Sequence, residues 1–487
     1  MNRNLTLIAL LAGPLSVCVA MLLLPTATEG TSATPIVIDQ SVRITIAVTL
    51  WMAIWWITEA IPLAVTALLP LIIFPISGVN TFKVSANAYA HPLIFLFLGG
   101  FLVSIAIQKS GLHRRFAVSI LRSVGREPSH LVGGFMVATA ILSMWLSNTA
   151  TTVMMLPIAL SVITGQPSGS DFSKCLLISI AYSASIGGMA TLIGTPPNLY
   201  IASYFSEVLN IEIGFVQWMA IGLPCSLLLL PCAWYYLTKV HFSLPLSSPG
   251  QDHDLSGEKL VWHELDRGSR VTLVIFVALI AGWILRPFLA ETQIFGLAPF
   301  NHINDAGIAL LAAFALFVVP VNLKDYTAVL VWEDTRGLPW DTLLLFGGGL
   351  SLAATIKSSG ADEVIGMWVS GIPSYPPIVV SAIIVAVIIL LTELTSNIAT
   401  TATLVPIFVA AAPLIGLDVN VLVPMIALAA SCAFMLPVAT PPNAIVFGSG
   451  HIRALDMART GFVMNVVALA TIATVGYTIV PLIMSVH

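Results

Sequence analysis

A polar six-residue pattern occurs twice in this apolar chain, at equivalent places in its two halves. Ser147-Asn148-Thr149-Ala150-Thr151-Thr152 leads to Pro157, and Ser396-Asn397-Ile398-Ala399-Thr400-Thr401 leads to Pro406 at the same spacing. Each copy is followed by a second break, Thr195-Pro196-Pro197-Asn198 in the first half and Thr440-Pro441-Pro442-Asn443 in the second. Paired interruptions of hydrophobic segments at corresponding positions of two halves point to a binding site at a repeat interface.

Composition decides the class of protein. Hydrophobic residues make up 58% of the 487 residues and charged residues 9%, whereas a soluble domain has roughly 25% charged residues. So few charges cannot cover a soluble surface. Because a spanning helix needs about 20 apolar residues, we predict an all-α polytopic membrane protein in a lipid bilayer, with about 11 transmembrane helices. No basic run suggests binding to nucleic acid.

The first apolar run has two interpretations. Residues 5–24 follow a short polar start, as in a cleaved signal peptide. The run is long for a signal peptide, however, and the segment Pro25-Thr26-Ala27-Thr28-Glu29-Gly30 is a poor cleavage site. We therefore favour a retained first helix.

The repeat sets the predicted organisation. Apolar segments on both sides of each Ser-Asn pair are too short to span comfortably, so each pair is expected at the tip of a re-entrant hairpin. The predicted parts are N-terminal helices that are mainly scaffold (1–90), repeat 1 (91–240) with a hairpin at 131–164 and a broken helix at 194–198, a cytoplasmic linker (241–270), and repeat 2 (271–487) with a hairpin at 377–414 and a broken helix at 439–443.

Charges beside the hairpins predict opposite orientations for the two repeats. The stretch 109–130 carries five basic residues and one acid, whereas the matching stretch 357–373 carries Lys357, Asp362 and Glu363. Cytoplasmic loops accumulate Lys and Arg. The first hairpin should therefore enter from the cytoplasm and the second from outside, which makes this an inverted-topology repeat.

The breaks suit a small anion bound together with small cations. Proline lacks an N–H and clashes with the preceding turn, so Pro196 and Pro441 interrupt their helices. Unwound backbone at membrane depth is tolerated only where it lines a cavity or is buried in protein. Its free carbonyls are oxygen donors for a cation. Helix N-termini after Asn148 and Asn397 attract anions. A lone Ser-Asn-Thr would be read as an interhelical contact, but two matched copies favour a site.

Other functions are weighed against this one. Glu59 and Glu393 are acids at membrane depth and hence candidates for function. A proton carrier is one possibility, but Glu393 orienting the second tip is the interpretation we prefer. A channel would share the composition, yet channels build their filters by oligomeric symmetry. Protease and hydrolase motifs are absent from the sequence, so no enzyme activity is expected.

These motifs resemble those of the divalent anion/sodium symporters, the INDY-type dicarboxylate, citrate and sulfate transporters. The resemblance covers nearly the whole chain. It is carried by both Ser-Asn tips, by Trp55-Trp56-Ile57-Thr58-Glu59-Ala60-Ile61-Pro62, by both Thr-Pro-Pro-Asn breaks and by the segment from Ala430 to Val446. The most similar group is that of bacterial sodium-coupled dicarboxylate transporters.

The resemblance implies a site and a mechanism. It implies a homodimer with scaffold and transport domains that work as an elevator. One sodium site would use Ser143, Ser147, Asn148 and Gly194, and the other Thr392, Thr395, Asn397 and Ala439. The substrate would contact Ser147, Asn148, Thr149, Pro196, Ser396, Asn397, Ile398 and Pro441. Ile398 departs from the family pattern, which has Thr there, and this loss of a hydroxyl affects the expected substrate.

The expected activity is sodium-coupled symport of a C4-dicarboxylate such as succinate, malate or fumarate across the bacterial inner membrane. The N-terminus would be cytoplasmic and the C-terminus external. Sodium is the coupling ion, and no prosthetic group is expected. The alternatives are a sodium-independent dicarboxylate exchanger and a family member that prefers citrate or sulfate.

Overall fold

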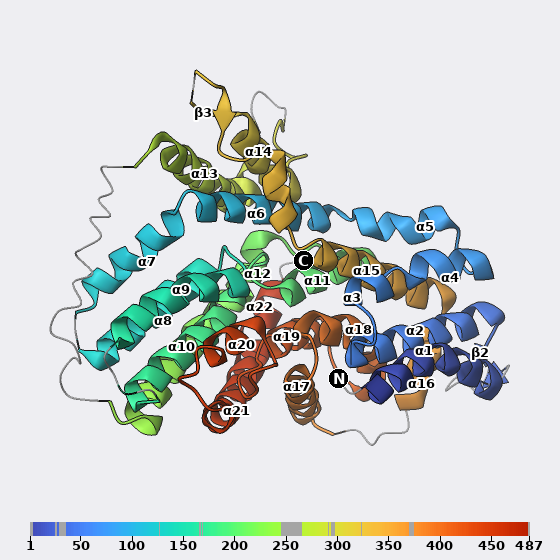
Figure 1. Ribbon diagram of the computed structural model, residues 1–487. Coiled ribbons are helices and arrows are strands. Elements are labelled where there is room, and N and C mark those ends of the chain that lie inside the picture. The colour runs from blue at the N-terminus through green and yellow to red at the C-terminus, as the bar shows by residue number, and fades with distance from the viewer. Residues whose placement is uncertain are drawn as a thin grey trace.

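The computed structural model describes residues 3–24, 27–28, 36–125, 127–164, 167, 169–244, 265–290, 292–293, 298–322, 324–369 and 375–485. Helices dominate (Figure 1). In the part described, two short antiparallel pairs are the strands: β1 (Ala27–Thr28) with β2 (Ile36–Val37), and β3 (Pro320–Asn322) with β4 (Thr327–Ala328). The predicted helical class is confirmed. Most of the predicted linker 241–270 lies outside the described residues.

Six described helical stretches are long and apolar enough to cross a membrane: Gln40–Thr58, Phe82–Lys109, Phe215–His241, Arg267–Ala290, Asn397–Ile415 and Ala454–Met484. Shorter apolar helices accompany them, including both arms of the first predicted hairpin. The chain thus has several apolar helices of the kind that span membranes. The estimate of about 11 spans, which also counts shorter helices, stays a prediction.

The N-terminal part consists of α1 (Arg3–Leu23), α2 (Gln40–Thr58), α3 (Leu63–Thr66), α4 (Leu69–Ser77), α5 (Phe82–Asn87), η1 (Ala88–Ala90) and α6 (Pro92–Lys109). Asp39 caps α2, since its carboxylate accepts from the backbone N–H of Val42 at 2.8 Å. Helix α1 packs along α2, and the indole N–H of Trp55 donates to the Leu10 carbonyl.

The first repeat continues with α7 (Leu112–Ser123), α8 (Pro128–Ser143), α9 (Asn148–Ile163), α10 (Asp171–Gly188), α11 (Pro196–Tyr204), the π-helical turn η2 (Phe205–Leu209), α12 (Phe215–Tyr235) and η3 (Tyr236–His241). Helix α7 is strongly amphipathic, with Leu112, Ala117, Val118 and Leu121 buried. Helix α10 packs against both α8 and α9.

The second half consists of α13 (Arg267–Ala290), α14 (Asp305–Val318), η6 (Trp332–Gly337), α15 (Trp340–Ser359), α16 (Ala361–Val369), α17 (Pro377–Thr392), α18 (Asn397–Ala411), η7 (Ala412–Ile415), α19 (Val419–Ala430), α20 (Pro441–Phe447), α21 (Ala454–Thr478) and α22 (Val480–Met484). Helix α19 packs against α17 and α18, as α10 packs against α8 and α9 in the first half.

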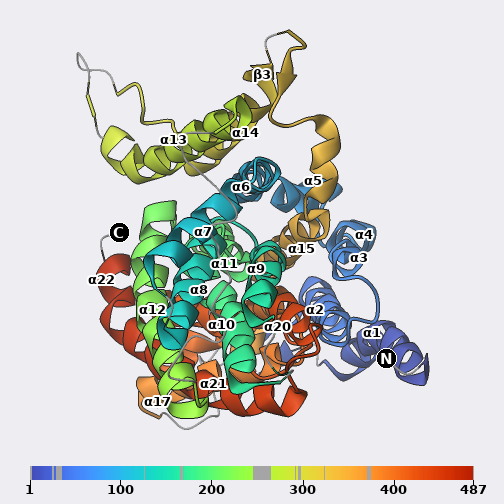
Figure 2. The same ribbon diagram turned by 60° about the vertical axis from the view of Figure 1, so that its left-hand side comes forward.

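The outer helices lie along a central core. Figures 1 and 2 show α6, α13 and α14 as a layer beside the core of α8–α12 and α17–α22, with α1–α4 on another side. Glycines that recur in both halves are packing points between helices. A Cβ on Gly99 would lie 2.6 Å from the backbone of Ala309 on α14, and one on Gly348 would lie 2.2 Å from the Ala67 carbonyl oxygen. Only glycine allows these approaches.

The two halves meet through equivalent residues. Phe97 on α6 and Phe346 on α15 occupy matching places in the two copies, and their ring centroids lie 5.5 Å apart. Contact between equivalent residues is typical of a two-fold relation between like units. This contact is what a repeat of two like halves leads one to expect, and the repeat organisation itself stays a prediction.

Candidate functional site

Each predicted tip is a short connection between two antiparallel helices. Helix α8 ends at Ser143 and α9 begins at Asn148, while α17 ends at Thr392 and α18 begins at Asn397. Ser147 is the N-cap of α9 and accepts from the N–H of Ala150 at 3.2 Å. Ser396 is the N-cap of α18 but makes no such side-chain bond. Both tips therefore present unpaired N–H groups of a first helical turn.

The two breaks have almost the same backbone geometry. Thr195 has φ −143° and ψ 143°, and Thr440 has φ −139° and ψ 151°, with a proline at the first position of the next helix in both cases. The residue before a proline is restricted to extended backbone, so α11 and α20 cannot be extended backward past Thr195 and Thr440. The chain between α10, which ends at Gly188, and α11, and between α19, which ends at Ala430, and α20 is not helical.

Two buried asparagines hold these unwound segments, and the sequence analysis did not assign them a role. The Asn198 amide nitrogen donates to the carbonyls of Gly188 (3.1 Å), Met189 (3.3 Å) and Thr191 (2.8 Å). The Asn443 amide nitrogen donates to the carbonyls of Ala433 (3.1 Å) and Leu436 (3.0 Å). The sequence signal for this role is that each asparagine directly follows a Pro-Pro pair.

Behind each tip, one hydroxyl faces two oxygen acceptors. The Ser143 hydroxyl lies 2.7 Å from Asn148 Oδ1 and 2.7 Å from the Ala184 carbonyl. The second repeat reproduces this arrangement, with the Thr392 hydroxyl 2.8 Å from both Asn397 Oδ1 and the Ala430 carbonyl. A hydroxyl has one proton to donate, so in the second set one oxygen pair remains without a hydrogen between its members, whereas in the first set the Asn148 amide nitrogen, turned toward Ser143 Oγ, supplies one.

The oxygen set at the first tip fits a small hard cation. The amide atom of Asn148 that faces this set lies 2.7 Å from Ser143 Oγ, 3.0 Å from the Ala184 carbonyl and 3.3 Å from the Gly194 carbonyl. Without a cation, the amide nitrogen satisfies these oxygens. With its oxygen turned there and these 2.7–3.3 Å separations widened slightly, the four atoms would all be oxygens, the ligand type that hard cations such as Ca²⁺ bind at about 2.3–2.6 Å. The described residues contain no cluster of three His, Cys, Asp or Glu side chains, so the donor set suits an alkali cation better than a transition metal.

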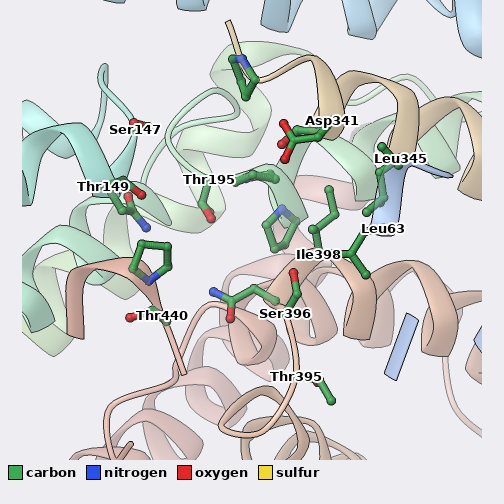
Figure 3. Close-up of a pocket in the computed structure, with 18 of the residues that line it drawn as sticks. Leu63, Ser147, Thr149, Thr195, Asp341, Leu345, Thr395, Ser396, Ile398 and Thr440 are labelled. Atoms are coloured by element: carbon green, nitrogen blue, oxygen red, sulfur yellow. The ribbon is translucent and has the colours of Figure 1, made fainter. Parts of the chain in front are cut away.

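Both tips and both breaks open into one cavity of about 1630 Å³. Figure 3 shows Ser147, Thr149 and Thr440 on one side of this cavity, Ser396 and Ile398 across from them, and Thr195 between the two groups. Of the predicted site residues, those that line it are Ser147, Asn148, Thr149, Gly194, Pro196, Thr395, Ser396, Asn397, Ile398, Ala439 and Pro441. Ser143 and Thr392 are fully buried behind the tips. The Thr395 hydroxyl forms hydrogen bonds with the Leu391 carbonyl and the Thr400 hydroxyl.

The cavity wall carries no basic side chain among the described residues, and its acids are Glu59 and Asp341. An anion bound at the tips would have to be stabilised by N–H groups, hydroxyls and co-bound cations, because an uncompensated charge at membrane depth is costly.

Glu393 has a different target from the one expected. Its carboxylate is 3% exposed and accepts from the backbone N–H groups of Phe434 (2.8 Å), Met435 (2.9 Å) and Leu436 (2.9 Å). It also accepts from the Asn465 amide at 2.8 Å. Glu393 thus holds the unwound segment after α19 and not the Ser396-Asn397 tip itself. Met144 occupies the matching place in the first repeat, where the Thr191 hydroxyl bonds the Met144 carbonyl instead.

Comparison with known proteins decides the family. The model of the sodium:sulfate symporter transmembrane region matches residues 5–486. The chain belongs to the sodium:sulfate symporter family. The predicted resemblance to sodium-coupled anion symporters is confirmed.

Relatives in this family are named as transporters and not as enzymes. The chain is 39% identical over 451 residues to the sodium-dependent dicarboxylate transporter SdcS of Staphylococcus saprophyticus, covering 90% of this chain and 86% of the relative. It is 37% identical over 462 residues to SdcS of Staphylococcus aureus (strain USA300), covering 91% and 86%.

Two solved structures share the fold. The YdaH transporter of Alcanivorax borkumensis aligns with a TM-score of 0.57 at 13% identity, over 97% of this chain and 98% of that one. MtrF of Neisseria gonorrhoeae aligns with a TM-score of 0.62 at 10% identity, over 97% and 94%. At this identity they bear on the membrane-transporter fold alone.

Proposed function

We propose that this symporter family member couples the uptake of a C4-dicarboxylate to sodium in the bacterial inner membrane. The observation that carries the proposal is the convergence of two matched oxygen sets and two helix N-termini on one cavity whose described lining has no basic side chain. The names of the SdcS relatives supply the substrate class and the ion.

Each repeat would bind one sodium ion and one end of the substrate. Sodium would be held by Ser143, Ser147, Asn148 and Gly194 at the first tip, and by Thr392, Thr395, Asn397 and Ala439 at the second. The carboxylates would contact the tips through Ser147, Asn148, Thr149, Ser396 and Asn397, with Pro196, Ile398 and Pro441 lining the space between. The Asn side chains would then belong to both the cation and the anion sites.

Sharing of Asn148 and Asn397 couples the two ligands. At the first tip a bound cation turns the Asn148 amide oxygen inward, whereas the Asn397 oxygen already faces the Thr392 hydroxyl. In both cases the amide nitrogen is then free to face the carboxylate. The positive charge of the bound cation also offsets the negative charge of the dianion in a site with few other charges. By linkage, sodium raises dicarboxylate affinity and the dicarboxylate raises sodium affinity by the same factor.

Replacing sodium by choline tests this function. Purified protein in proteoliposomes should accumulate succinate against its gradient with external sodium and lose at least about 90% of this uptake in choline, because uncompensated charge blocks dianion binding. No proton gradient is imposed. Equal uptake in both buffers, or counterflow without sodium, would favour the sodium-independent exchanger instead.

We further propose an elevator mechanism in a homodimer, with inverted repeats and a cytoplasmic N-terminus. The core of α8–α12 and α17–α22 would move against the outer helices. The charge asymmetry between α7 and α16 supports opposite orientations of the two repeats.

Cysteine labelling tests the orientation. Ser123→Cys on α7 and Glu363→Cys on α16 replace exposed residues, in a background where the exposed Cys18 and Cys232 are serine. A membrane-impermeant maleimide added to intact spheroplasts should label the Glu363→Cys protein at once. The Ser123→Cys protein should be labelled only after permeabilisation. Labelling of both from one side contradicts the inverted repeat.

A further inference from the structure

The substrate cavity is chemically unequal at its two ends. At the first tip, Thr149 in the first turn of α9 offers a hydroxyl and is exposed to the cavity. At the second tip, Ile398 takes the equivalent place in the first turn of α18 and offers only methyl and methylene groups. The first copy of the repeat thus shows a threonine at the position that Ile398 occupies in the second copy.

Ile398 is part of an apolar wall. Leu63 from α3 and Leu345 from α15 line the same cavity, and Figure 3 shows both beside Ile398, across from Ser147 and Thr149. Helix α15 packs against both α3 and α18, which brings the three side chains together. A polar substituent turned toward these three side chains would lose its water and find no hydrogen-bond partner among them.

Asp341 lies at the edge of the same wall. It precedes Leu345 by one helical turn on α15, so the two side chains share a face, and both line the cavity. Asp341 is exposed, and the structure gives its carboxylate no ion pair among the described residues. A third carboxylate on the substrate that approached this edge would meet a like charge.

We propose that the wall of Ile398, Leu63 and Leu345, with Asp341 at its edge, makes this transporter selective for unsubstituted or alkyl-substituted C4-dicarboxylates. It discriminates against hydroxylated C4 acids through the wall and against tricarboxylates through Asp341. This inference rests on the proposed dicarboxylate transport and narrows its substrate class.

Competition against labelled succinate in sodium-loaded assays measures the selectivity. For the unaltered protein, 2-methylsuccinate should inhibit about as well as succinate. Malate should inhibit roughly ten-fold more weakly, within the range expected when an apolar pocket rejects an added hydroxyl. Citrate should be weaker than malate.

Two variants of nearly equal shape isolate the hydroxyl at this position. Ile398→Thr and Ile398→Val differ by one hydroxyl in place of one methyl. The Thr variant should bring the malate-to-succinate ratio of inhibition constants about five-fold closer to one, and the Val variant should retain the original preference. Asp341→Asn should strengthen inhibition by citrate at least about three-fold without changing the malate-to-succinate ratio of inhibition constants, as removal of one like charge predicts. Leu344→Thr, on the exposed side of α15, should change neither ratio.

The outcomes separate this inference from the proposed function. Sodium-dependent succinate uptake with malate as good an inhibitor as succinate overturns the selectivity alone. Equal ratios in the Thr and Val variants overturn the role of Ile398, and unchanged citrate inhibition in Asp341→Asn overturns that of Asp341. Absence of sodium-dependent uptake of any C4-dicarboxylate overturns the proposed function and this inference together.

Discussion

Replacing Asn148 or Asn397 by alanine is expected to reduce sodium-dependent succinate uptake below about 1% of the original rate. Each substitution removes an amide from the proposed cation site and from the proposed carboxylate site at once. Hydrogen bonds to charged groups contribute about 1.5–3 kcal/mol each, and loss of two such interactions exceeds a hundred-fold effect. Uptake at saturating sodium and at several succinate concentrations would measure it.

The symmetry of the two tips sharpens this prediction. Because Ser143–Asn148–Ala184 and Thr392–Asn397–Ala430 have the same geometry, both variants should fail to a similar extent. Asn420→Ala, at the start of α19 and outside the cavity, is the matched control and should transport normally. A variant that elutes as a folded protein and still transports near-normally removes its asparagine from the site.

Replacing Glu393 should impair both folding stability and transport. The Glu393 carboxylate accepts four hydrogen bonds, three of them from consecutive backbone N–H groups of the unwound segment. In Glu393→Ala these buried donors lose their acceptor, at about 1–3 kcal/mol for each group left unsatisfied. We expect a clearly lower melting temperature in detergent and at least about a ten-fold loss of uptake, since several kcal/mol are lost next to the second tip.

Glu393→Gln gives a graded version of this test. Glutamine keeps one acceptor oxygen but turns an NH₂ group toward a backbone N–H. The melting temperature of the Glu393→Gln protein should therefore lie between those of the Ala variant and the original protein. Glu363→Gln removes an exposed carboxylate on α16 and should change neither melting nor uptake. Normal melting of Glu393→Gln and Glu393→Ala would mean that the unwound segment does not depend on this carboxylate.

Much of the candidate site could be predicted from the sequence because it consists of local interruptions. A Ser-Asn pair between two short apolar segments and a Thr-Pro-Pro-Asn break each have their structural effect within a few residues. Their duplication located Asn148, Asn397, Pro196 and Pro441, and the structure brings all four to one cavity.

Contacts that join distant segments through backbone atoms could not be predicted in this way. The carbonyls of Ala184 and Ala430 complete the oxygen sets, yet any residue type supplies a carbonyl, so no side-chain pattern marks them. For the same reason the sequence predicts that Glu393 orients the nearby tip. In the structure its carboxylate oxygens instead accept hydrogen bonds from the backbone N–H groups of residues 434–436.

By itself the sequence determined the membrane class, the internal repeat and the places where its helices break, since apolar content and proline act locally. Only the tertiary structure decided which oxygens face one another and that Ile398, Leu63 and Leu345 form one wall beside Asp341. These groups come from separate helices, and their proximity depends on close packing of α3, α15 and α18, which is a property of the whole fold and not of any one segment.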